Sequence, residues 1–142
     1  MKQFSVVLSL LLTLCAIESH AQSLYIWKPQ GGSTSAKVPG NWKISTCNGT
    51  TATVLPGATD TLLFSNCSAN NAVLDTNLNV AFFSMKSNYT GTISRSGSFT
   101  LTAGKMKVSG GTFSGGSTAI TVNGTTSVDG GIYCHLGHDD YP

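Results

Sequence analysis

Apolar and small polar residues alternate through the second half of the chain, and this alternation returns at a fixed interval. The segment 90–93 (TGTI) has the same pattern as 110–113 (GGTF) and 130–133 (GGIY). In the same register, 104–109 (GKMKVS) matches 124–129 (GTTSVD). Alternation with a period of two is typical of a strand with one buried face. A fixed longer period indicates a repeat architecture.

Each period contains about three short strand-like pieces separated by turn residues such as Ala103-Gly104 and Asn123-Gly124. In 110–129 these pieces are GTFS, TAITV and TTSVD. Asn-Gly and Asp-Gly also form hairpins, but a meander of such short strands needs no fixed longer period. The pattern therefore predicts an all-β chain, a right-handed parallel β-solenoid (β-helix) with coils of about 20 residues.

Equivalent residues of consecutive coils stack on one another in this fold, because parallel strands pair about 4.8 Å apart. A third match, Phe99–Leu101 with Ile120–Val122, is offset by one residue from the others. Counting back and forward by the same step predicts one interior column of four side chains: Val73, Ile93, Phe113 and Tyr133.

Residues 22–71 do not repeat, and they hold both tryptophans and three of the four prolines. A solenoid cannot leave its first coil bare, because an exposed strand edge pairs with other chains. We therefore expect a Trp-containing N-terminal cap and first coil over 22–71, with 60–64 (DTLLF) as the first strand of the stack. Solenoid coils are expected over 72–133. Residues 134–142 break the pattern, and we expect an irregular tail of a chain that is truncated or continues in a longer parent.

The N-terminus has the pattern of a secretory signal peptide over residues 1–21. Lys2 precedes an apolar run at 4–17, and Ser19 and Ala21 occupy the small-residue positions of a cleavage site. A membrane anchor is the alternative, but the run is short for a bilayer span of about 20 residues. The expected protein is secreted or on the cell surface, without a membrane span after cleavage.

Three cysteines remain after signal cleavage. Cys47 and Cys67 lie in similar contexts (STCNGT and SNCSAN), and an oxidising compartment favours disulfides. We predict a Cys47–Cys67 disulfide; two buried free thiols are the alternative. Cys134 is left as the odd cysteine.

Charge is sparse, with 8 basic and 6 acidic residues scattered singly. This pattern excludes a nucleic-acid footprint. It also suits a solenoid, where like charges in consecutive coils would stack and repel.

Several short motifs together resemble the opening of large exported bacterial surface proteins, the relatives of autotransporter passengers and filamentous adhesins. The motifs are Tyr25–Trp27 (YIW), Gly40–Trp42 (GNW), Leu55–Gly57 (LPG), Asp60–Phe64 (DTLLF), Ala72–Asp75 (AVLD), Tyr89–Ile93 (YTGTI) and Ser109–Phe113 (SGGTF). The resemblance implies a signal peptide, a Trp-containing cap and many solenoid coils. It also implies an adhesive or structural role at the cell surface.

Catalytic candidates are few. A polysaccharide-degrading β-helix needs clustered Asp, Arg or Lys on one face, whereas the carboxylates are dispersed and Arg95 stands alone; the mature carboxylates are Asp60, Asp75, Asp129, Asp139 and Asp140. Ligand types suited to a metal gather at the C-terminus, in Cys134, His135, His138, Asp139 and Asp140. They lie outside the repeat, where nothing preorganises them. We therefore expect no enzyme activity, no metal and no cofactor.

Trp27, Trp42 and Tyr25 allow two interpretations. Exposed in one plane they would form a platform for a sugar, and buried they would pack the cap. The expected function is a structural, adhesin-like module; a non-catalytic carbohydrate-binding module is the alternative, and a fragment of a β-helix polysaccharide-degrading enzyme comes third. Expected partners are surface glycans, other cell-surface proteins, or a second copy at the exposed end of the solenoid.

Overall fold

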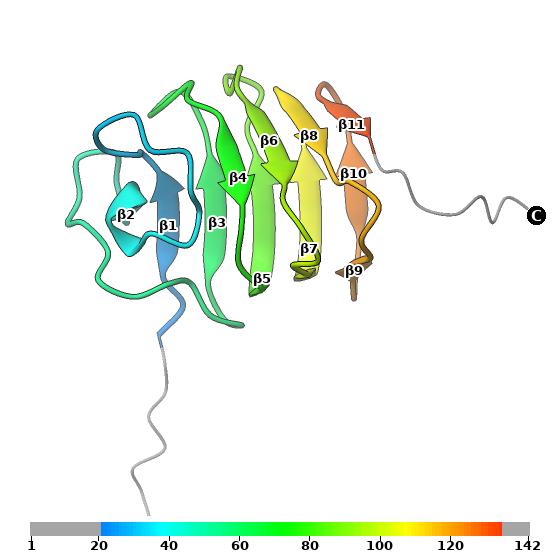
Figure 1. The fold of residues 1–142 in the computed structure, drawn as a ribbon, viewed down its shortest axis with the longest axis horizontal. Helices are drawn as coiled ribbons and strands as arrows, with labels where there is room; N and C mark the ends of the chain where they lie inside the picture. Colours follow the sequence, from blue (N-terminus) through cyan, green and yellow to red (C-terminus); the bar gives the residue numbers. More distant parts are fainter. Residues whose placement is uncertain (1–20, 135–142) are drawn as a thin grey trace, which may run out of the picture.

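The computed structural model describes residues 21–134. The predicted signal peptide, apart from Ala21, lies outside these residues, as do His135, His138, Asp139 and Asp140. The described chain is a stack of parallel coils about 21 residues apart, forming a β-solenoid of about four turns (Figure 1). The predicted parallel β-solenoid is therefore confirmed.

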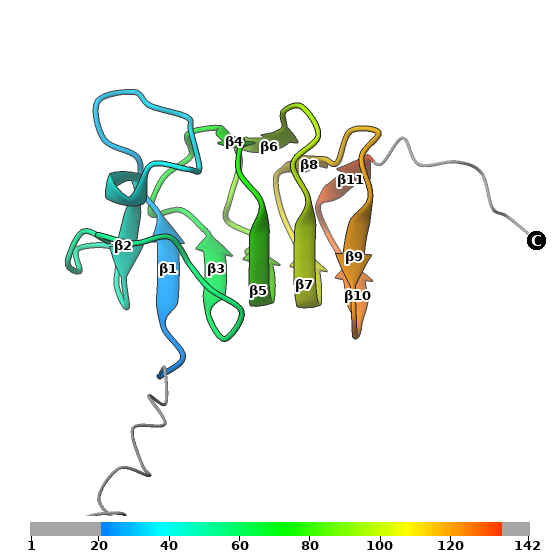
Figure 2. The same cartoon turned by 60° about the horizontal axis from the view of Figure 1, so that its bottom comes forward.

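Two sheets run along the stack, and Figure 2 shows their strands as two rows. The larger sheet contains β1 (Leu24–Trp27), β2 (Trp42–Ile44), β3 (Thr61–Phe64), β5 (Leu78–Met85), β7 (Leu101–Val108), β9 (Ile120–Val122) and β10 (Thr126–Val128). The smaller sheet contains β4 (Ala72–Leu74), β6 (Thr92–Arg95), β8 (Thr112–Ser114) and β11 (Ile132–Cys134). One 3₁₀ turn, η1 (Pro39–Asn41), precedes β2.

The smaller sheet contains the predicted interior column, with one correction. Ile93 pairs with Phe113, and Phe113 pairs with Tyr133. The predicted place of Val73 in the column is wrong. Val73 pairs with Ser94 and is only half-buried, whereas Ala72 pairs with Ile93 and is fully buried. The step from Ala72 to Ile93 is one residue longer than the step from Ile93 to Phe113. A slip of one residue turns a side chain to the other face of a strand.

The larger sheet departs from three short strands per coil. β7 runs without a break through the expected corner at Ala103-Gly104. Its pairing with β5 nevertheless skips Gly104, where an added Cβ would lie 2.6 Å from the Ala81 carbonyl oxygen. In the next coil the pieces stay separate, as β9 and β10, and both pair with β7. The offset match is also wrong, because Leu101 pairs with Ile120.

The stack begins one coil earlier than predicted. β1 is parallel to β3, so the first stacked strand lies inside the region assigned to the cap, before 60–64. β2 then returns antiparallel along the outer edge of β1. Between the two sheets the interior is apolar, and its largest fully buried side chains are Trp27, Trp42, Tyr89, Phe64, Phe83 and Phe113.

Candidate functional site

The aromatic residues of the cap are buried, so of the two interpretations given above the exposed sugar-binding platform is wrong and packing in the cap agrees with the structure. Trp27 and Trp42 are 0% exposed and Tyr25 is 5% exposed. The two indole rings pack edge to face with centroids 5.0 Å apart. Trp27 Nε1 donates a hydrogen bond to the Asn70 carbonyl (3.1 Å), and Trp42 Nε1 donates to the Ala36 carbonyl (3.0 Å). Each buried N–H has a partner, as a packed core requires.

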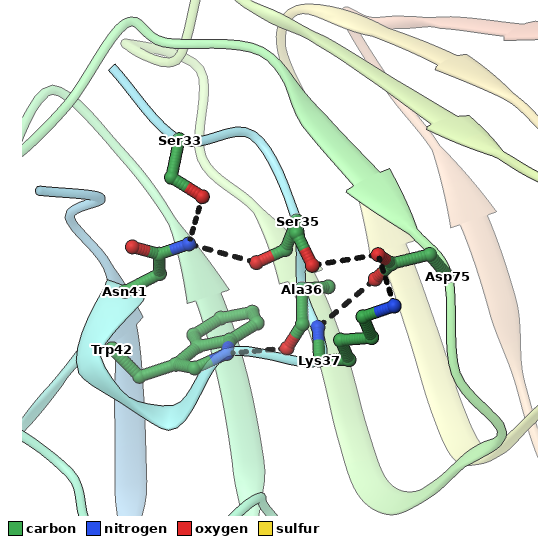
Figure 3. Close-up of polar contacts among 7 residues, drawn as sticks. All are labelled: Ser33, Ser35, Ala36, Lys37, Asn41, Trp42 and Asp75. Atoms are coloured by element: carbon green, nitrogen blue, oxygen red, sulfur yellow. Dashed lines mark hydrogen bonds and ion pairs between the residues drawn. The ribbon is translucent and has the colours of Figure 1, made fainter. Parts of the chain in front are cut away.

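Asn41, at the end of η1, holds the loop that precedes it (Figure 3). Its side-chain amide donates to Ser33 Oγ at 2.9 Å and to the Ser35 carbonyl at 2.8 Å. Its Oδ1 accepts the backbone N–H of Gln30 at 3.2 Å. A buried amide with three partners fixes a loop that has no strand of its own.

Asp75 joins this loop to the first full coil (Figure 3). The Ser35 hydroxyl donates to Asp75 Oδ2 (2.6 Å), and the Lys37 backbone N–H donates to Oδ1 (3.0 Å). The Lys37 ammonium lies 3.9 Å from the same carboxylate. Ser35 also bridges Val73 in parallel register, so the loop covers the outer edge of β4.

The predicted Cys47–Cys67 disulfide is confirmed, with a Cα–Cα distance of 5.4 Å. It ties the turn after β2 to the turn after β3. Lys43 of β2 in turn bridges Thr51 in antiparallel register. The outer edges of both sheets are therefore covered at the N-terminal end. Cys134 is an exposed free cysteine.

The C-terminal end is open. β9, β10 and β11 pair with the preceding coil, and no described strand lies on their other side. Val128 is 48% exposed and Ile132 is 59% exposed. The Tyr133 ring stacks on Phe113, with centroids 5.5 Å apart and planes 7° from parallel. Such an edge presents unpaired backbone N–H and C=O groups to another strand.

The described carboxylates belong to separate structural contacts. Asp60 accepts the backbone N–H groups of Ser23 and Gly57, both at 2.8 Å. Asp129 pairs with Lys107 at 2.9 Å. A hydrogen bond from the Ser109 hydroxyl, together with Lys107, lowers the pKa of Asp129. Within residues 21–134 no three His, Cys, Asp or Glu side chains come together to hold a metal ion.

Arg95 stabilises two neighbouring turns. Its guanidinium donates to the carbonyl oxygens of Gly115 (3.0 Å) and Thr118 (2.5 Å), and to that of Phe99. Burial lowers its pKa, and the nearby Tyr133 opposes that shift. A lone arginine gave no sequence signal for this role, because its acceptors are backbone carbonyls from two coils.

Comparison with known proteins gives no family assignment. No family model matches the chain, and neither a curated protein nor a solved structure matches it significantly. In the part of the chain that the structure describes, no helix has the length and apolar character to cross a membrane.

Proposed function

We propose that this chain is a structural, adhesin-like β-solenoid module of an exported bacterial protein, without catalytic activity. The observation that carries the proposal is the difference between the two ends of the stack. The N-terminal end is closed by β2, by the loop at Ser35 and by the disulfide. Within residues 21–134, the C-terminal end has three strands with no partner on their outer side.

This asymmetry suits a structural role. A closed end starts a stack and prevents pairing there, and an open end templates a further coil of the same register. Each added coil lengthens a rigid rod by about 4.8 Å, and such a rod holds its surface away from the cell. The described carboxylates support the absence of catalysis, since Asp60 and Asp75 each stabilise a turn or a loop and Asp129 pairs with Lys107 of β7.

Export is supported by the sequence of residues 1–21 and by the disulfide, which persists in oxidising compartments. The test is to express the full chain in a bacterial host, separate the cell fractions and determine the N-terminal residue by mass spectrometry. We expect a chain outside the cytoplasm that begins at Gln22 and contains the disulfide.

Two leucines of the apolar run provide the control for export. Leu10→Arg with Leu11→Arg breaks that run and should keep the chain in the cytoplasm. Recovery of the unmodified chain beginning at Met1 in the cytoplasm would contradict the proposal.

Adhesion is tested separately, with beads coated by the purified chain and incubated with host or bacterial cells. Folded protein should increase the number of attached beads. Beads coated with Phe113→Asp, which places a charge in the buried column, should attach no better than uncoated beads. Equal attachment by both coatings would contradict an adhesive role for the fold.

A further inference from the structure

A polar cavity of about 430 Å³ opens on the outer surface of the larger sheet, where β5, β7 and β10 end. Its walls include Phe82, Ser84, Lys86, Lys107, Ser109 and Asp129. The volume falls in the range of small-molecule sites, about 300–1,000 Å³. None of these residues belongs to the closed cap or to the open edge strands.

The register of the coils builds this cavity. Ser84 pairs with Lys107, and Lys107 pairs with Ser127. The neighbours of Ser84 in β5, Phe83 and Met85, are fully buried in the interior cluster, so Ser84 faces the outer side. Three consecutive coils thus contribute to one wall, and the rigid stack holds their side chains in place.

Buried hydroxyls usually have a hydrogen-bond partner, and the Ser84 hydroxyl is an exception in the described part of the chain. Ser84 is 4% exposed, and within residues 21–134 its hydroxyl has no hydrogen-bond partner. Ser65, which is 6% exposed, accepts the backbone N–H of Cys67 at 3.3 Å. An unpartnered hydroxyl with so little exposure is disfavoured in a folded protein. Its place in the wall of the cavity points to a ligand that supplies the missing partner.

The charges of the cavity favour an anion. Lys86 and Lys107 line it, and Lys105 is the register partner of Phe82 in the neighbouring strand. Asp129 is the one carboxylate among its described lining residues, and it pairs with Lys107 at 2.9 Å, so the uncompensated positive charge of the lining is that of Lys86. The Lys86 ammonium is exposed and has no ion-pair or hydrogen-bond partner in the described chain. A ligand carboxylate or sulfate would therefore gain a charge-assisted hydrogen bond there.

We propose that this cavity binds an acidic saccharide, a sugar ring that carries a carboxylate or a sulfate. The Ser84 hydroxyl and the Asp129 carboxylate bind sugar hydroxyls, the half-buried Phe82 ring offers an apolar surface, and Lys86 binds the anionic group. The proposal rests on the adhesive function for its biological setting and names the ligand class. Its test uses purified protein, so that failure to bind and failure to be exported are separate results.

The first experiment is isothermal titration calorimetry of the purified full chain with oligosaccharides of equal length. The probes are oligogalacturonate (carboxylate), a sulfated dextran oligosaccharide (sulfate) and a neutral malto-oligosaccharide. At least one acidic probe should bind about tenfold more tightly than the neutral probe. Comparison of the two acidic probes identifies which anionic group is preferred. Equal affinity for all three, or no binding, overturns the proposal.

Variants separate this site from general attraction of anions to a basic surface. Lys86→Gln should weaken acidic-probe binding about tenfold, and Ser84→Ala about threefold. Lys37→Gln removes an exposed lysine of the cap and should leave the affinity unchanged. A loss in Lys37→Gln equal to that in Lys86→Gln overturns the proposal.

Thermal unfolding completes the test. Ser84→Ala should keep or raise the melting temperature, since it removes a hydroxyl that has no partner, whereas Ser65→Ala should lower it. A Ser84→Ala variant that unfolds early and still binds the acidic probe with full affinity would show that the hydroxyl is structural, and it overturns the proposed role of Ser84.

Discussion

The Asn70 carbonyl oxygen links the cap to the coils, because one side chain from each region donates a hydrogen bond to it. It accepts hydrogen bonds from Trp27 Nε1 at 3.1 Å and from the Tyr89 hydroxyl at 2.8 Å. Tyr89 is 1% exposed and packs against Phe64, with ring centroids 5.6 Å apart. Burial raises the pKa of the Tyr89 phenol. The neutral phenol therefore contributes both packing and a hydrogen bond.

Tyr89→Phe should lower the free energy of unfolding at pH 7 by about 0.5–1.5 kcal/mol, the usual net value of one hydrogen bond. The cost stays modest, because the Asn70 carbonyl keeps its bond from Trp27. The unfolded phenol has a pKa of about 10. Since the folded pKa is higher, stability from the neutral phenol is complete below about pH 10 and is lost as pH rises above it.

Urea unfolding of both proteins at pH 7, 9 and 10.5 checks this prediction. The advantage of the native chain over Tyr89→Phe should be constant up to pH 9 and smaller at pH 10.5. An advantage at pH 10.5 equal to that at pH 7 would mean that the phenol ionises without penalty in the folded chain and would contradict the prediction.

At the residue scale, the sequence predicted contacts that repeat and missed those that do not. The pairing of Ile93 with Phe113 follows from the constant step that relates 90–93, 110–113 and 130–133. Val73 was misplaced because the preceding step is one residue longer. The buried state of Trp27 and Trp42 depends on a cap whose loops have no periodicity. The Ser84 cavity gave no signal, since a serine in a Ser-rich chain carries no information until its neighbours in other coils are known.

Two glycines with nearly equal backbone angles show how the elements turn. Gly111 has φ +66° and directly precedes the strand β8, whereas Gly116 has φ +67° and follows it. A Cβ on Gly111 would lie 2.6 Å from the Gly91 carbonyl oxygen, whereas a Cβ on Gly116 would meet nothing within 4 Å. Alanine substitutions at these two glycines therefore separate the free-energy cost of the backbone angle from the cost of a clash with the neighbouring coil.

Gly116→Ala should lower the free energy of unfolding by about 1–2 kcal/mol, because the left-handed region is unfavourable for an L-residue. Gly111→Ala should cost about 3 kcal/mol or more, since it adds a clash with backbone of the preceding coil. Chemical unfolding of the two variants checks the difference. Equal losses would show that the coils separate easily at this corner.

The Cys47–Cys67 disulfide adds a covalent link to the cap. It joins two turns 20 residues apart in the sequence. Replacing both cysteines, Cys47→Ser with Cys67→Ser, should lower the free energy of unfolding by about 2–4 kcal/mol. Cys134→Ser is the matched control, because that cysteine is exposed and free, and it should leave stability unchanged. A stable double variant would indicate that noncovalent contacts alone hold the cap.

At the element scale, the sequence located most strands of the repeat but not their continuity. The pieces predicted for 110–129 are β8, β9 and β10. In the coil before, the Ala103-Gly104 corner is a local break in pairing within the continuous β7. A dipeptide that ends in glycine can either separate two strands or interrupt the pairing within one strand, because glycine tolerates a turn as well as a close approach to the next strand. The antiparallel β2 was not predicted, since it belongs to no repeat.

The stack formed by residues 21–134 is closed at its N-terminal end and open at its C-terminal end. The interior cluster extends from the cap through Phe113, and exposure rises in the last coil, where Val128 and Ile132 face solvent. In a solenoid, stability is approximately a sum of coil terms and of interfaces between neighbouring coils. The last coil lacks one of its two interfaces within the described residues and should be the least stable part of the stack.

A duplicated coil tests this view directly. Inserting a second copy of 110–129 after Asp129 keeps the step that already relates β8 to β11 and β7 to β10. The new strands should pair with β8, β9 and β10, bury Val128, and raise the midpoint of urea unfolding together with the m-value, which scales with the surface exposed on unfolding. Amide hydrogen exchange in 120–128 should slow, because strands that are now edges gain partners. A matched insert with the same composition in scrambled order should raise neither quantity. If the ordered insert behaves like the scrambled one, the open edge is not a template for further coils, and the proposed role as an extendable rod loses its main support.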